Sequence, residues 1–250
     1  EKLAHTMETI GKLERYEGHL LNWYDVKTLT PLEPRYVSSV DSGNLLGALW
    51  SLEHGLDQLI QRPVLDGKAF EGLRDTGEIL KQVVEQESIS GLDAHALDAL
   101  MRAWETPPAR IADVLRLLRR VEGSVRALAD QARESADVET GAAYWASQME
   151  EQVSAWLRIR DRYLTWIEIL DEKTEEEVVP LGLKALFSIR QGLYRAPSLL
   201  DLVHGHIGCI PILQSIRKEA PSAAAPLFEW LDRLMEAFAK SRWLAGEILG

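Results

Sequence analysis

The sequence contains few of the residues that build disulfides, metal clusters or nucleic-acid interfaces. Its 250 residues include one cysteine, Cys209, which excludes an intrachain disulfide and a thiolate metal cluster and favours a reducing compartment. Acidic residues outnumber basic ones by 39 to 28, which gives a formal net charge of -11. Because binding to nucleic acid or to an anionic membrane needs a basic surface, we expect neither nucleic acid nor direct membrane contact.

Long apolar runs and common catalytic signatures are also missing. No apolar run reaches the roughly 18 residues of a membrane-spanning helix, and the best candidate, 207–213, is interrupted by Gly208 and Pro211. The sequence has no Gly-rich phosphate loop, no GxSxG elbow and no HExxH motif. His204 and His206 lie two residues apart without an evident third ligand, so we expect no bound metal and no cofactor.

Most of the sequence has the periodicity of amphipathic helices, which predicts an all-α fold of antiparallel helical hairpins. Apolar residues spaced three and four apart predict helices over 2–21, 44–60, 70–86, 93–104 and 139–171. Asp41 or Ser42 is expected to cap the second of these, and Thr106, before two prolines, to start a further helix. We expect one helical domain over residues 1–250, with an acidic linker at about 171–181 between its parts.

The segment 16–49 fits neither a helical nor a strand period. Pro31 and Pro34 interrupt it, so we predict a long irregular loop near residues 22–42. A sugar site needs flat aromatic faces for the C–H side of the ring and planar polar groups for pairs of hydroxyls. The segment supplies both, and the predicted substrate-binding residues are Trp23, Tyr24, Asp25, Arg35, Tyr36, Asp41 and Asn44.

Residue chemistry alone leaves two other interpretations open. In the first, Asp41 caps a helix, Arg35 pairs with Asp25, and the protein is a non-catalytic helical scaffold or protein-interaction module whose aromatic loop is structural. In the second, Asp25 and Asp41 are the acid and base of a small glycosidase.

Residues 14–49, ERYEGHLLNWYDVKTLTPLEPRYVSSVDSGNLLGAL, resemble a segment of the bacterial cyclic β-1,2-glucan synthases. In that family a similar run opens a central glucoamylase-like (α/α)6 domain. The resemblance implies an α/α toroid whose loops line a glycan cleft, in a protein that synthesises and cyclises β-1,2-glucan. It adds Ser38 and Ser42 to the expected substrate-binding residues and makes β-1,2-glucan, or a related oligosaccharide, the expected ligand.

The sequence departs from the family after this segment. The SIGY-like and YYDLLASEAR-like segments that precede the family's catalytic acids do not occur before Gly250. We therefore expect the opening half of the domain, inactive alone, with the remainder of the parent polypeptide as a partner. The resemblance places it on the cytoplasmic side of an inner-membrane protein anchored through other segments. Apolar helix faces that lack neighbours would favour association of copies.

Overall fold

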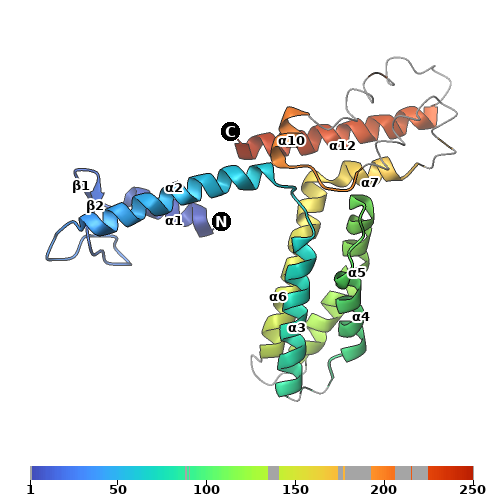
Figure 1. The fold of residues 1–250 in the computed structure, drawn as a ribbon, viewed down its shortest axis with the longest axis horizontal. Helices are drawn as coiled ribbons and strands as arrows, with labels where there is room; N and C mark the ends of the chain where they lie inside the picture. The colour runs from blue at the N-terminus through green and yellow to red at the C-terminus, as the bar shows by residue number, and fades with distance from the viewer. Residues whose placement is uncertain are drawn as a thin grey trace. The chain divides into compact units, whose positions relative to one another are not determined.

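The computed structural model describes residues 2–87, 89, 91–134, 141–173, 177, 193–205, 215 and 225–249. These residues are mostly helical with one short hairpin, so the all-α prediction is confirmed (Figure 1). The chain divides into two units, unit 1 (Glu1–Leu59) and unit 2 (Ile60–Gly250). The described elements are α1 (Lys2–Lys12), β1 (Arg15–Tyr16), β2 (His19–Leu20), α2 (Ser39–Gln61), α3 (Lys68–Gln86), α4 (Ala94–Glu105), α5 (Ile111–Glu134), α6 (Gly141–Tyr163), α7 (Thr165–Asp171), α10 (Leu199–His204) and α12 (Ala225–Leu249).

Unit 2 is built around the four helices α3 to α6, which lie side by side (Figure 1). Helix α5 packs along α6, while α3 packs against both α6 and α4. The residues that the spacing predicts to face inward on α5 are all buried, as expected for an amphipathic helix in a bundle. They are Val114, Leu118, Val121, Val125 and Leu128.

Helix α12 packs against α6, α7 and α10. The indole Nε1 of Trp230 donates a hydrogen bond of 2.7 Å to the carbonyl oxygen of Ile169. Trp166 and Phe238 meet edge to face, with ring centroids 5.6 Å apart. Aromatic side chains therefore hold α7 and α12 together, through one hydrogen bond and one edge-to-face contact between rings.

Two predicted helix boundaries in unit 2 are wrong. Helix α5 begins at Ile111 rather than Thr106, since a residue before proline is disfavoured in the helical region and two prolines follow here. The helix predicted over 139–171 is two helices, α6 and α7, separated at Leu164. Of the predicted acidic linker, Asp171 is the last residue of α7, and residues 174–176 and 178–181 lie outside the described residues.

Unit 1 departs from the helix predicted over 2–21. Helix α1 ends at Lys12, and β1 and β2 form an antiparallel hairpin with Tyr16 opposite His19. The turn residues Glu17 and Gly18 have φ angles of 50° and 88°. A two-residue hairpin turn with positive φ at both positions follows the right-handed twist of the strands, and Gly18 adopts it without a steric cost.

Helix α2 begins at Ser39, five residues before the predicted start. Ser38 is its cap, because the Ser38 Oγ accepts a hydrogen bond of 3.1 Å from the backbone N–H of Asp41. The prediction that Asp41 or Ser42 caps the helix is therefore wrong. The helix ends at Gln61, two residues before Pro63, as expected. None of its residues is buried.

Candidate functional site

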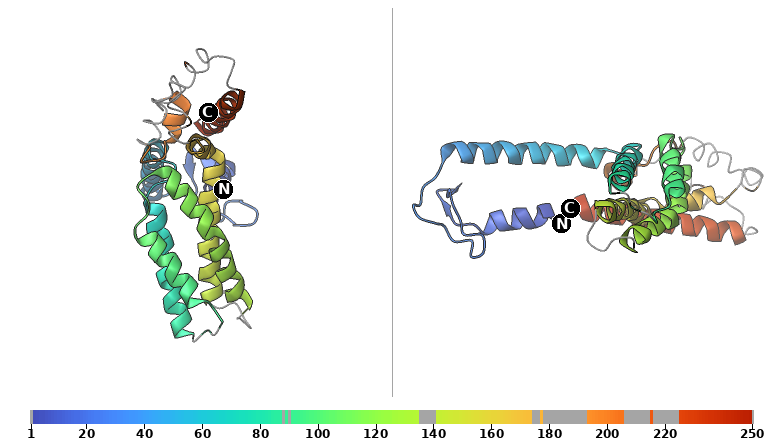
Figure 2. Two further views of the ribbon diagram at one scale, coloured as in Figure 1. Left: turned by 90° about the vertical axis from the view of Figure 1, so that its right-hand side faces the viewer. Right: turned by 90° about the horizontal axis from the view of Figure 1, so that it is seen from below.

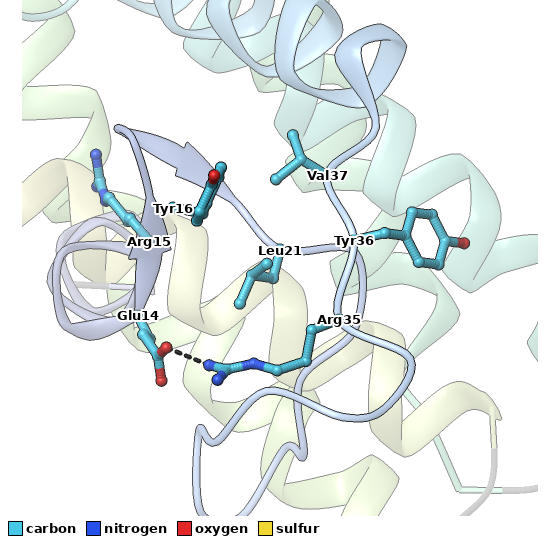
Figure 3. A pocket seen from close by; sticks show the side chains of 7 residues that line it. All are labelled: Glu14, Arg15, Tyr16, Leu21, Arg35, Tyr36 and Val37. Carbon is cyan, nitrogen blue, oxygen red and sulfur yellow. Dashed lines mark hydrogen bonds and ion pairs between the residues drawn. The ribbon is translucent and has the colours of Figure 1, made fainter.

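Unit 1 contains a pocket of about 380 Å³ between the β-hairpin and the end of the long loop (Figure 3). This volume lies in the range of small-molecule sites. The chain reaches the pocket from two segments, one at the hairpin and one just before α2. The lining residues are Glu14, Arg15, Tyr16, Leu21, Arg35, Tyr36 and Val37.

An ion pair joins these two segments across the pocket. The guanidinium of Arg35 bonds to the carboxylate of Glu14, so the alternative pairing with Asp25 is wrong (Figure 3). The Arg35 and Glu14 side chains remain 43% and 56% exposed. Because guanidinium only donates and carboxylate only accepts, the pair presents both kinds of hydrogen-bonding group to a molecule in the pocket.

Two tyrosines supply aromatic surface. Tyr16 is 62% exposed and Tyr36 is 47% exposed. Tyr36 is fixed by the loop, since its hydroxyl accepts a hydrogen bond of 2.8 Å from Asn22 Nδ2 and its carbonyl oxygen accepts one of 2.9 Å from the Asn22 backbone. The Tyr36 ring points away from Leu21 (Figure 3). The ring is also directed away from the Glu14–Arg35 pair (Figure 3).

Tyr24 holds the loop against the hairpin instead of lining the pocket. Its hydroxyl donates to the carbonyl oxygen of Glu14 at 2.7 Å and accepts from the backbone N–H of Leu21 at 2.6 Å. Both partners are lining residues, so Tyr24 fixes the backbone at two points of the pocket. Trp23 is 58% exposed, and its carbonyl oxygen accepts a hydrogen bond from Leu32.

Asp25 shapes a turn within the loop. Its carboxylate oxygen accepts hydrogen bonds from the backbone N–H groups of Thr28 and Lys27, at 2.8 and 2.9 Å, and from the Thr28 hydroxyl at 3.0 Å. These bonds, with the Thr28 backbone first and that of Lys27 second, lower the pKa of Asp25. A carboxylate held ionised by three donors is suited to fixing a turn rather than to giving up a proton.

The remaining predicted residues belong to the start of α2. Ser38 caps the helix, and Asp41 lies exposed in its first turn, where a negative charge is favourable. Ser42 and Asn44 follow on the same helix. Of the nine predicted site residues, Arg35 and Tyr36 therefore line the pocket.

Sequence reasoning missed the hairpin side of the pocket, namely Glu14, Arg15, Tyr16 and Leu21, because the apolar spacing of 2–21 was interpreted as one helix. The signal that would have found it is the Glu17–Gly18 pair between two short polar-and-aromatic runs, which suits a tight hairpin turn. Val37 was missed as an ordinary apolar residue.

Unit 2 has a second hollow, of about 230 Å³, where α12 meets α6 and α7. Its polar lining includes Asp161, Arg233 and Lys240. His204 is the last residue of α10, while His206 and Cys209 lie outside the described residues. Across the described ranges, no three His, Cys, Asp or Glu side chains are grouped as a metal would require, and no helix has the length and apolarity that crossing a bilayer demands.

Comparison with known proteins gives one informative similarity. No family model matches the chain. The chain is 40% identical over 86 residues to cyclic beta-(1,2)-glucan synthase NdvB of Rhizobium meliloti (strain 1021). The match covers 34% of this chain and 3% of that protein, so the chain corresponds to a small part of it. Over about a third of its length, the chain is thus similar to a cyclic β-1,2-glucan synthase, the family that residues 14–49 resemble.

Proposed function

We propose that unit 1 supplies a glycan-binding surface to a protein that synthesises or cyclises β-1,2-glucan. The observation that carries the proposal is a pocket lined by the Glu14–Arg35 pair and by two exposed tyrosines, Tyr16 and Tyr36. All residues that line this pocket lie within residues 14–49, whose sequence resembles the synthases.

The chemistry of the pocket suits a sugar ring. A glucose unit presents an apolar C–H face, which stacks on an aromatic ring such as that of Tyr16. Its neighbouring hydroxyls both donate and accept, so one can donate to the Glu14 carboxylate while the next accepts from the Arg35 guanidinium. Leu21 and Val37 supply the apolar wall that keeps water from competing along one side.

In this proposal the chain binds the glycan, and catalysis takes place elsewhere in the complete protein. In the complete protein, a pair of carboxylates outside this chain would cleave the β-1,2 bond through an oxocarbenium-like transition state, and a sugar hydroxyl would accept the chain. We propose that the helical hairpins of unit 2 form part of a larger α/α toroid, with the remainder of the polypeptide as partner. We place this part of the protein on the cytoplasmic side.

Calorimetric titration of linear β-1,2-gluco-oligosaccharides into the full chain tests the proposal. We expect Arg35→Ala and Tyr16→Ala each to weaken binding about tenfold or more, which is about 1.4 kcal/mol. The matched controls are Arg158→Ala and Tyr144→Ala, two exposed residues of α6, which should bind like the parent. Equal affinity in all five proteins, or no binding by the folded parent, would refute the pocket assignment.

A structural scaffold is the second candidate, favoured by the hydrogen bonds that Tyr24 and Asp25 make within the loop. In that case Arg35→Ala would lower the stability of unit 1 with no change in heat on addition of sugar. Cello-oligosaccharides of the same length serve as the test of linkage. Binding that does not distinguish the β-1,2 from the β-1,4 bond would support a general sugar surface rather than a β-1,2-glucan site.

A further inference from the structure

The Glu14–Arg35 ion pair leaves hydrogen-bonding groups free at the pocket. The pair joins Oε1 of Glu14 to Nη2 of Arg35. Across the described part of the chain, Glu14 Oε2 and the Nε and Nη1 groups of Arg35 make no hydrogen bond or ion pair. Because a carboxylate only accepts and a guanidinium only donates, a free acceptor and free donors lie side by side. Two neighbouring hydroxyls of a sugar match this arrangement, since one can donate while the other accepts.

The pocket is open and does not enclose its contents. None of its seven lining residues is buried, and five of them are exposed. Its volume of about 380 Å³ lies at the small end of small-molecule sites. In Figure 3 the Tyr16 ring and Leu21 lie on one side of the segment that carries Arg35, and the Tyr36 ring points to the other side. A single sugar ring can therefore enter beside Tyr16 while the rest of a glycan stays outside.

The linkage of a glucan decides which edge of an internal ring can enter such a pocket. An internal β-1,2-linked glucose is joined to its neighbours through C1 and C2, which are adjacent. The opposite edge of the ring therefore keeps free hydroxyls on the neighbouring carbons C3 and C4. In a β-1,4 chain the two bonds leave from opposite ends of the ring, and in a β-1,3 chain no two neighbouring hydroxyls of an internal unit are free. Of these three linkages, β-1,2 alone presents a free hydroxyl pair opposite both of its glycosidic bonds.

We propose that the pocket receives internal units of a β-1,2-glucan by their C3–C4 edge, and that it therefore binds a closed glucan ring as well as a linear chain. This inference rests on the function proposed above. The 3- and 4-hydroxyls bond to Glu14 Oε2 and to the free N–H groups of Arg35, and the C–H face of the same ring stacks on Tyr16. Both glycosidic bonds remain at the mouth of the pocket, so binding requires no chain end.

Calorimetric titration of the full chain with four glucans tests this inference. The probes are linear β-1,2-glucan, cyclic β-1,2-glucan, linear β-1,3-glucan of matched length, and cyclic β-1,2-glucan treated with periodate and then with borohydride. Periodate cleaves the C3–C4 bond where both carbons carry free hydroxyls, and it leaves the glycosidic bonds intact. We expect the first two glucans to have affinities within about threefold of each other per glucose unit, and the last two to bind at least about tenfold more weakly.

A pair of variants tests the role of the carboxylate. Glu14→Gln should weaken the binding of both β-1,2-glucans about tenfold. Glu151→Gln, the same change at an exposed ion pair of α6, should bind like the parent. Circular dichroism establishes that both variants are folded. Unchanged affinity in a folded Glu14→Gln protein would overturn the assignment of the hydroxyls to the ion pair.

The four glucans also separate this inference from the proposed function. Binding of linear but not of cyclic β-1,2-glucan would overturn the recognition of internal units and leave the glycan-binding surface in place. Equal binding of the β-1,3-glucan or of the periodate-treated ring would overturn the role of the 3- and 4-hydroxyls. Absence of binding of every glucan by the folded parent chain would overturn both proposals.

Discussion

Asp171 is the residue whose substitution gives the sharpest test of the fold of unit 2. Its side chain is 5% exposed and joins the end of α7 to the start of α5 through two arginines. Arg110 donates to its Oδ1 at 2.8 Å, and Arg116 forms an ion pair with its Oδ2. The hydrogen bond to Asp171 is the largest of the contacts that raise the pKa of Arg116. We predict that Asp171→Asn strongly destabilises unit 2.

The loss of stability depends on how well the two arginines are solvated once the Asp171 charge is removed. Removing one partner of a buried ion pair costs about 3–5 kcal/mol, because the other charge stays buried without compensation. Arg110 is 23% exposed and keeps Asp113 at 3.9 Å, whereas Arg116 is 48% exposed and can be hydrated. We therefore expect the lower end, about 3 kcal/mol. For a unit of this size that corresponds to a fall in melting temperature of about 6–12 °C.

The assay is thermal and urea unfolding followed by near-ultraviolet circular dichroism, which reports the buried tryptophans of unit 2. Asp130→Asn is the matched control, since it makes the same chemical change to an exposed carboxylate paired with Arg133 on α5. Exposed pairs contribute about 1 kcal/mol or less. The reasoning is refuted if Asp171→Asn and Asp130→Asn lower the stability equally.

Three further predictions concern packing, capping and pH. Gly77→Ala should lower the free energy of unfolding by about 1 kcal/mol, because the added Cβ would overlap Met101 Sδ. Gly123→Ala has open space around it and should raise the free energy of unfolding by about 0.5–1 kcal/mol. Urea unfolding measures both changes, and a stabilised Gly77→Ala would contradict the packing. Ser38→Ala should lose about 1 kcal/mol of helix stability and shorten α2 at its start, measured by amide hydrogen exchange, while Ser39→Ala should not. Because the pKa of Asp25 is lowered, the hydrogen bonds of its turn are fully formed above the ordinary carboxyl pKa of about 3.9 and are lost as the pH falls through the lowered pKa. The amide resonances of Lys27 and Thr28 should therefore shift over that lower pH range. In Asp25→Asn the same resonances should not shift with pH.

The interiors of the helices could be predicted from the sequence, but several of their ends could not. The α5 stripe from Val114 to Leu128 is buried as its spacing requires, because burial of one face follows directly from the helical period. Helix ends depend on single residues instead. The pre-proline position of Thr106 delays α5, and the backbone at Leu164, with φ −124° and ψ 2°, separates α6 from α7.

The candidate site could be predicted only in part. Arg35 and Tyr36 line the pocket from the irregular segment before α2, which Pro31 and Pro34 predict. Glu14 and Tyr16 were missed because a single pair, Glu17–Gly18, converts an apparently continuous helical pattern into a hairpin. Asp25, predicted from its polar chemistry, and Ser38, predicted from the family resemblance, are both structural, because each accepts a hydrogen bond from a nearby backbone N–H.

The most direct test of the central claim is a ¹H–¹⁵N NMR titration of the full chain with a linear β-1,2-gluco-oligosaccharide. Binding at the proposed pocket predicts saturable shifts of the amides of Glu14 to Leu21 and of Arg35 to Val37, while the amides of α12 stay unchanged. Shifts confined to unit 2, or no shifts at millimolar sugar with unit 1 folded, would contradict the assignment of the glycan site to this pocket.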